Sequence, residues 1–349
     1  MGVCIALAAC AREAAPPARV DPIATVDAGI ADATASDAAN DVIDAAPAPR
    51  VEITPDELRG DFYVSFADEA DAAHIHVTTL GLNGTSKVRR LTNGARVQDD
   101  PVVITQDGLV FLRTPPDGSG MPSILGIVSL DGTNERELAR CVHICDDVSL
   151  GADGRVHFID RNVPKLATIK SVSTKRGKPD VRVWSANIRA LGACYVGLGT
   201  TPDRSKLFLW ANNDLGWPEC KGSAQGIYFA SFDARTLGKP VHPKHALFEE
   251  DELHSPVRRA WMRAGSDRIF FEGITKTTRD WPRASANFSC RADGSDVRLD
   301  EDVRSEWRIE TTDTGVVAKK PGASDLVLLA GLKGVRAVVF SREFTPPRE

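Results

Sequence analysis

Short apolar runs follow turns built on Asp or Gly at regular intervals along the chain. One copy is Gln106-Asp107-Gly108 before the apolar residues 109–112, and another is Thr201-Pro202-Asp203 before residues 207–210. Such turns suit the hairpins that join antiparallel strands, and runs of this length fit short buried strands. The same pattern places turns at Asp56, Asp107, Asp153, Asp203, Asp267 and Gly315, and successive turns lie 46 to 64 residues apart.

Each repeat also contains a second hairpin. Residues 127–130 precede Asp131-Gly132, and residues 288–290 precede Asp293-Gly294. A period near fifty residues, with about four short strands in each unit, predicts a β-propeller with one blade per repeat. We therefore expect an all-β fold in which residues 51–349 form a six-bladed propeller. We name the strands of each blade A to D from the inside outward, and we expect the six turns to join strands A and B. Three residues of the inner strands should be buried between blades: Val103, Val148 and Val196.

The repeat resembles that of a known family. The Pro-Asp turn, the segment Leu130-Asp131-Gly132 and the closing Arg89-Arg90-Leu91-Thr92 are similar to the Pro-Asp variant of the WD-like propeller repeat, best known from TolB-type periplasmic proteins. The resemblance extends over residues 51–349. Two departures are that the α/β domain preceding the propeller in TolB has no counterpart here and that the sixth repeat is degraded. The resemblance therefore supports the fold more than it supports TolB's partners.

The N-terminal segment predicts a location. Leu7-Ala8-Ala9-Cys10 ends an apolar run and resembles a bacterial lipobox, which would make residues 1–10 a lipoprotein signal peptide and Cys10 the lipidated residue. The run is short and has no basic residue before it, so a chance apolar start is an alternative. Myristoylation at Gly2 is disfavoured because Ala6 stands where Ser or Thr is needed.

Residues 11–50 are expected to form a disordered linker. They contain 14 Ala, 6 Asp and 5 Pro and no aromatic residue, so they cannot bury enough apolar surface to fold. Such a tether fits a domain held at a membrane surface. Ala11 after the lipid site favours, by resemblance to proteobacterial lipoproteins, the outer membrane, with the domain facing the periplasm or the cell surface.

Charge and cysteine content give further predictions about the ligand class and the cellular compartment. The net charge of −5 disfavours nucleic-acid binding. An oxidising periplasm would allow two disulfides, one within the loop of Cys141 and Cys145 and one between Cys194 and Cys220. A zinc site at Cys141, His143 and Cys145 is the less favoured alternative, because no fourth ligand is evident. Cys290 is then a small buried hydrophobic residue.

Candidate chemistry is sparse, and the sequence contains no recognisable catalytic or nucleotide-binding motif. The pairs Asp99-Asp100 and Asp146-Asp147 precede comparable strands, and Glu306 has a similar position in the sixth repeat. Asp100, Asp147 and Glu306 could hold Ca²⁺ at a central channel, although we favour carboxylates that cap loop amides and no cofactor. His74 and His76 could form a metal pair, but solvent-facing strand residues are the favoured interpretation.

The loops indicate a binding surface. The B–C loops at residues 211–226 and 273–287 are long, and the same side would carry several Arg residues. The expected binding residues are Trp217, Glu219, Arg279, Asp280, Trp281, Arg113, His254, Arg258, Arg259 and Arg304. Two functions remain open: a non-catalytic, monomeric envelope lipoprotein that binds a protein or cell-wall polymer, and a lactonase, lyase or glycosidase that uses channel carboxylates. The missing motifs favour binding.

Overall fold

The computed structural model describes residues 56–341, apart from residues 70–71, 82–83, 116–121, 162–166, 186–194, 213–225, 233–238, 246–256, 263–265, 275–284, 300–306 and 321. The signal segment, the linker and Cys10 therefore lie outside the described residues. None of the helices in the described part is long and apolar enough to cross a membrane.

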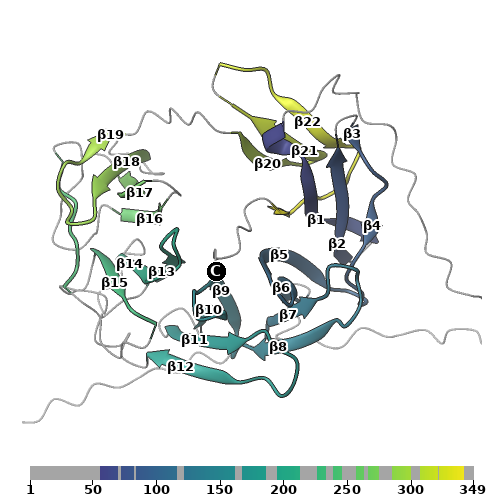
Figure 1. The fold of residues 1–349 in the computed structure, drawn as a ribbon, viewed down its shortest axis with the longest axis horizontal. Helices are drawn as coiled ribbons and strands as arrows, with labels where there is room; N and C mark the ends of the chain where they lie inside the picture. Colours follow the sequence, from purple (N-terminus) through teal and green to yellow (C-terminus); the bar gives the residue numbers. More distant parts are fainter. Residues whose placement is uncertain are drawn as a thin grey trace, which may run out of the picture. The chain divides into compact units, whose positions relative to one another are not determined.

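The described strands form five sheets, of which the largest contains two antiparallel groups joined by one parallel pair, Ala73 with Gln98. The resulting six antiparallel groups follow one another as the blades of a β-propeller (Figure 1). The 3₁₀ helix η1 (Asp56–Leu58) precedes β1 (Gly60–Glu69), β2 (Ala72–Gly81), β3 (Gly84–Thr85) and β4 (Arg89–Arg90) of blade one. Blade two contains β5 (Gln98–Thr105), β6 (Gly108–Thr114), β7 (Ile124–Val128) and β8 (Arg136–Arg140). Blade three contains β9 (Ile144–Leu150), β10 (Arg155–Arg161), β11 (Ala167–Ser173) and β12 (Val181–Ser185).

The remaining blades continue the same up-and-down order. Blade four contains β13 (Tyr195–Thr200), β14 (Leu207–Asn212) and β15 (Gly226–Ala230). Blade five contains β16 (Val257–Met262), β17 (Arg268–Ile274), β18 (Ser285–Arg291) and β19 (Arg298–Leu299). Blade six contains β20 (Arg308–Thr312), β21 (Gly315–Lys319) and β22 (Leu326–Ala330), and the chain then enters β23 (Ala337–Phe340).

The last strand completes the first blade. β23 pairs antiparallel with β1, with Phe62 opposite Phe340 and Ser65 opposite Ala337. The rings of Phe62 and Phe340 stack with their centroids 4.4 Å apart, and the Asp61 amide donates to Ser341 Oγ at 2.9 Å. β1 is therefore the second strand of its blade, and β23 is the inner one. The prediction that the turn at Asp56 joins strands A and B of its own blade is wrong, because that inner strand comes from the other end of the chain.

Five apolar clusters fill the spaces between neighbouring blades. Each combines buried side chains of two blades, as where Ile159 of blade three packs with Leu198 of blade four, or Val64 of blade one with Val316 of blade six. The other three clusters lie between blades one and two, two and three, and four and five. Blades one to four thus have a cluster on each face, which explains why most residues of β2 are buried.

The other five predicted turns join the first and second strands of their blades, as expected. Gly108 shows why one of them needs glycine: its φ is 144°, and a Cβ there would lie 2.3 Å from the Val128 carbonyl oxygen. Val103 and Val148 are only half-buried, although both pack against the cluster between blades two and three. The side chain of Val196 lies outside the described residues.

The structure contains one of the two expected disulfides. Cys141, just after β8, is bonded to Cys145 near the start of β9, and both are buried. This bond excludes a zinc site that uses the two thiolates together with His143. Cys194 and Cys220 lie outside the described residues. Cys290 is a buried free cysteine, as expected, and burial raises the pKa of its thiol to about 12.

Candidate functional site

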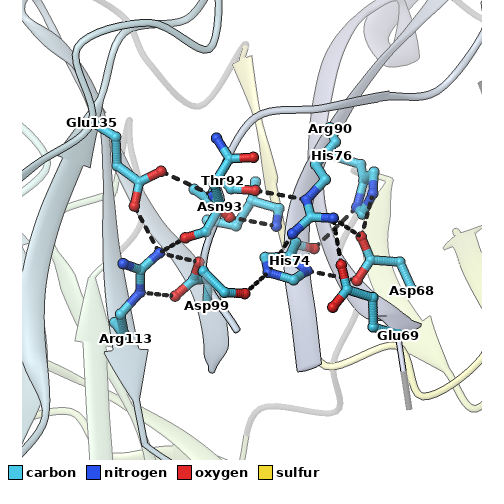
Figure 2. Close-up of polar contacts among 12 residues, drawn as sticks. Asp68, Glu69, His74, His76, Arg90, Thr92, Asn93, Asp99, Arg113 and Glu135 are labelled. Atoms are coloured by element: carbon cyan, nitrogen blue, oxygen red, sulfur yellow. Dashed lines mark hydrogen bonds and ion pairs between the residues drawn. The ribbon is translucent and has the colours of Figure 1, made fainter. Parts of the chain in front are cut away.

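A β-bulge at the hairpin between β1 and β2 creates an unusual polar cluster. The register places His74 opposite Phe66 and His76 opposite Val64, and it shifts between Ala67 and Glu69. Asp68 is thus the extra residue of the bulge, a position that redirects a side chain. We call Asp68, Glu69, His74, His76 and Arg90 the His74 cluster (Figure 2).

The Asp68 carboxylate lies between the two imidazole rings. Its Oδ1 is 2.6 Å from His74 Nδ1 and its Oδ2 is 3.2 Å from His76 Nε2. The three side chains are at most 3% exposed. Burial raises the pKa of Asp68, but the contacts with His74 and His76 outweigh it and hold that pKa well below its usual range. Burial likewise lowers the pKa of His74, yet the hydrogen bonds with Asp68 and the Gly94 carbonyl leave it raised.

Arg90 covers the solvent side of the cluster. Its Nη1 is 2.8 Å from Glu69 Oε1 and 3.6 Å from Asp68 Oδ2, and its Nη2 is 2.7 Å from His74 Nε2. The arginine side chain is 33% exposed and that of Glu69 is 50% exposed. The buried side chains close the cluster toward the protein interior. A small ion can reach it from solvent past the Arg90 and Glu69 side chains.

A second ion-pair cluster adjoins the first in Figure 2 and is centred on Arg113. Arg113 donates to both oxygens of the fully buried Asp99 at 2.7 Å and to Glu135 at 2.8 Å. It also donates to the Asn93 carbonyl at 2.7 Å, and the Asn93 amide donates to Glu135. The segment after β4 is thereby fixed against blade two. Arg113, an expected binding residue, has a structural role in these contacts.

The favoured interpretation of the two histidines as solvent-facing is wrong. His74 and His76 alternate onto one face of β2, but that face packs beside Phe66, whose ring stacks on His76 at 4.0 Å. The reason is that blade one has a neighbour on each face, so alternation does not separate core from solvent. Sequence reasoning also missed Asp68, Glu69 and Arg90. The available signal was a carboxylate just before a hairpin that returns with His-x-His.

The paired carboxylates of the inner strands bind arginines. Besides Asp99 with Arg113, Asp100 accepts two hydrogen bonds of 2.9 Å from Arg336, and Asp146 accepts one of 2.8 Å from Arg161. Asp146 also accepts a hydrogen bond from the amide of Asp147, which belongs to β9 and not to an inter-blade loop. Glu306, the third expected calcium ligand, lies outside the described residues.

Asp147 differs from these carboxylates. It has a left-handed φ of 44° at an irregularity of β9, and its buried Oδ2 has no hydrogen-bond partner. Burial and the charge of Asp146 raise its pKa to about 7, although Arg161 and Arg259 oppose the shift. Backbone strain combined with a perturbed carboxyl group is a recognised mark of functional sites.

A cavity of about 890 Å³ opens on the side of the A–B turns, between blades two, three and four. Asp107, Asp153 and Asp203 line it together with Arg155 and Arg182. This is the opposite side from the long loops on which we expected the binding surface. Of the expected binding residues, Arg259 is exposed on β16, and Arg258 is described only in its backbone. The others beyond Arg113 lie outside the described residues: Trp217, Glu219, Arg279, Asp280, Trp281, His254 and Arg304.

Comparison with known proteins supports the fold. No protein-family model and no curated protein matches the chain. Among solved structures, TolB from Acinetobacter baumannii superposes with a TM-score of 0.52 at 9% identity, over 82% of this chain and 68% of TolB. A puromycin hydrolase gives 0.46 at 16% identity, over 81% and 45% of the two chains. A gluconolactonase from Xanthomonas campestris gives 0.35 at 13% identity, over 57% and 65%.

These likenesses bear on architecture alone. The chain spans about two thirds of TolB and less than half of the hydrolase. At identities below 20%, the activities of those proteins are not assigned to this chain. The order of its antiparallel strand groups and the similarity to TolB identify residues 56–341 as a β-propeller.

Proposed function

We propose that the chain is a non-catalytic lipoprotein of the bacterial cell envelope whose propeller binds a protein or a cell-wall polymer. The lipid anchor is assigned to Cys10 and residues 11–50 serve as the tether. We assign the protein to the outer membrane, as a monomer facing the periplasm or the cell surface. With a net charge of −5, nucleic acid is not its ligand.

The observation that supports this proposal is that carboxylates of the inner strands form ion pairs with arginines. A propeller hydrolase or lyase needs acidic groups free to contact a substrate. Asp99, Asp100 and Asp146 are instead bound to Arg113, Arg336 and Arg161. These pairs rigidify the scaffold, and a rigid scaffold lowers the ordering cost of presenting binding loops.

The test compares the two sides of the propeller. Mature protein is incubated with envelope extract and, separately, with purified cell-wall sacculi. The double variant Trp217→Ala/Trp281→Ala removes the aromatic side chains of the long-loop side, and Lys175→Ala/Arg182→Ala is the matched control on the cavity side. Loss of capture with the tryptophan variant alone supports the expected surface. Loss with the control alone moves binding to the cavity, and absence of capture by every folded version, wild type included, contradicts a binding function.

The enzyme alternative rests on Asp147. Its Oδ2 has no hydrogen bond and only a 4.0 Å contact with Arg161, and a pKa near 7 suits a general acid or base. A screen with lactone and glycoside substrates, repeated with Asp147→Asn, tests it. Turnover that the wild type shows and the variant lacks would replace the binding proposal.

A further inference from the structure

The hydrogen positions of His74 and His76 are constrained by backbone carbonyls. His76 Nδ1 lies 3.0 Å from the carbonyl oxygen of residue 74, so this nitrogen carries the hydrogen. His74 Nε2 lies 2.7 Å from the carbonyl oxygen of Gly94 and donates to it in the same way. The other ring nitrogen of each histidine points at Asp68, and that of His74 is hydrogen-bonded to it (Figure 2).

Only the His74 contact with Asp68 is a hydrogen bond. His74 Nδ1 and Asp68 Oδ1 are 2.6 Å apart, and His76 Nε2 and Asp68 Oδ2 are 3.2 Å apart. His76 Nε2 is buried and has no hydrogen-bond partner. One divalent cation in place of the hydrogen between His74 and Asp68 would also provide a partner for His76 Nε2. Metal-binding histidines characteristically donate their second ring N–H to a carbonyl, as both rings do here.

We propose that Asp68, His74 and His76 bind one divalent transition-metal ion of the Zn²⁺ type, with Glu69 as the fourth ligand. Two imidazole nitrogens with carboxylate oxygens suit Zn²⁺ and its neighbours, whereas Ca²⁺ and Mg²⁺ prefer all-oxygen sites. Bonds of about 2.1 Å in a tetrahedron place ligand atoms roughly 3.4 Å apart. His76 and Asp68 are already 3.2 Å apart, whereas His74 and Asp68, at 2.6 Å, would move apart to bind the ion. Ligand atoms of Asp68, Glu69 and His74 all lie within 4.8 Å of one another.

Arg90 controls access to this site. Its Nη2 lies 2.7 Å from the ring nitrogen of His74 that already donates to Gly94, so two donors face each other. Because the guanidinium is one-third exposed, it can rotate into solvent, which removes this conflict and releases Glu69 from its ion pair. A bound ion would then join β1 to β2 at the bulge. Four protein ligands make this a structural metal site.

The experiment measures metal binding to the full chain after treatment with a chelator. Titration with Zn²⁺ should give one ion per chain and a higher melting temperature, because the ion binds only the folded state. Co²⁺ should give the visible absorption of a tetrahedral site. His76→Gln should weaken Zn²⁺ binding at least about 100-fold, since losing even a supporting contact typically costs 10–100-fold. Arg90→Gln should tighten binding about tenfold by removing a competing cation.

His157→Gln is the matched control. His157 is equally buried and contacts a carboxylate, Asp153 at 3.3 Å, but it lies in blade three. It should leave the affinity unchanged. Glu69→Gln changes an exposed side chain and serves as a second variant if His76→Gln does not fold; it should bind more weakly. Absence of stoichiometric binding to the wild type, or equal affinities and Co²⁺ spectra in the wild type and the folded cluster variants, would overturn the proposal.

Discussion

Asp147 combines a left-handed backbone, a buried oxygen without a hydrogen bond and a raised pKa at one residue of β9. The folded protein therefore binds a proton that the unfolded chain releases between about pH 4 and pH 7. The free energy of unfolding should fall as pH rises through this window and level off above it. A backbone hydrogen bond from Leu198 lowers the pKa of Asp147 and offsets part of this cost.

Asp147→Asn should therefore stabilise the protein above pH 7 by on the order of 2 kcal/mol and have little effect near pH 4. Asn also tolerates a left-handed backbone. Urea unfolding at pH 5 and pH 8 measures the difference. Asp99→Asn is the contrasting control, because it leaves Arg113 without its buried partner and should destabilise at both pH values. A variant of Asp147 that loses stability at pH 8 would contradict this assignment.

The histidines show the limit of sequence reasoning at this scale. The alternation of side chains along a strand correctly placed His74 and His76 on one face. It contains no information that blade six lies against that face. Asp68 was equally hidden, because a bulge, and not a motif, directs it at the rings. Side-chain surroundings in a propeller depend on blades that are remote in sequence.

At the scale of elements, the join between β23 and β1 depends on few residues. Phe340 stacks on Phe62 and is 6% exposed, so Phe340→Ala should reduce the free energy of unfolding by about 3–4 kcal/mol. Val338→Ala, on the same strand but half-buried, should cost clearly less. Denaturant unfolding of both variants provides the measurement. Equal losses would show that closure does not depend on the phenylalanine stack.

The hairpin turns could be predicted from the sequence, whereas the pairing of β23 with β1 could not, and the reason is physical. Asp107-Gly108 and Pro202-Asp203 determine a hairpin through their own backbone preferences, so a local motif located the strands they join. The pairing of Phe62 with Phe340 has no such local signal, because β23 is an ordinary apolar run. The Cys141–Cys145 bond was predictable because the two cysteines are close in sequence.

At the scale of the whole molecule, the proposed anchor gives a direct prediction. Mass spectrometry of protein from its native membrane should find a mature N-terminus at a lipidated Cys10, and the protein should fractionate with membranes. Cys10→Ala should release it to the soluble fraction, while Cys290→Ala, the control, should not. An unmodified Cys10 within an intact chain would remove both the anchor and the envelope assignment.

The closure of blade one also determines when folding can finish. Asp61 and Ser341 are hydrogen-bonded across 280 residues of sequence. During synthesis or export the emerging chain can form its middle hairpins, but blade one lacks its inner strand until residues 337–340 have left the ribosome or the translocation pore. Until then β1 has an unpaired edge, which is a target for proteases and for other chains. A chaperone that protects this edge would act on a chain in which blades two to six have already been synthesised.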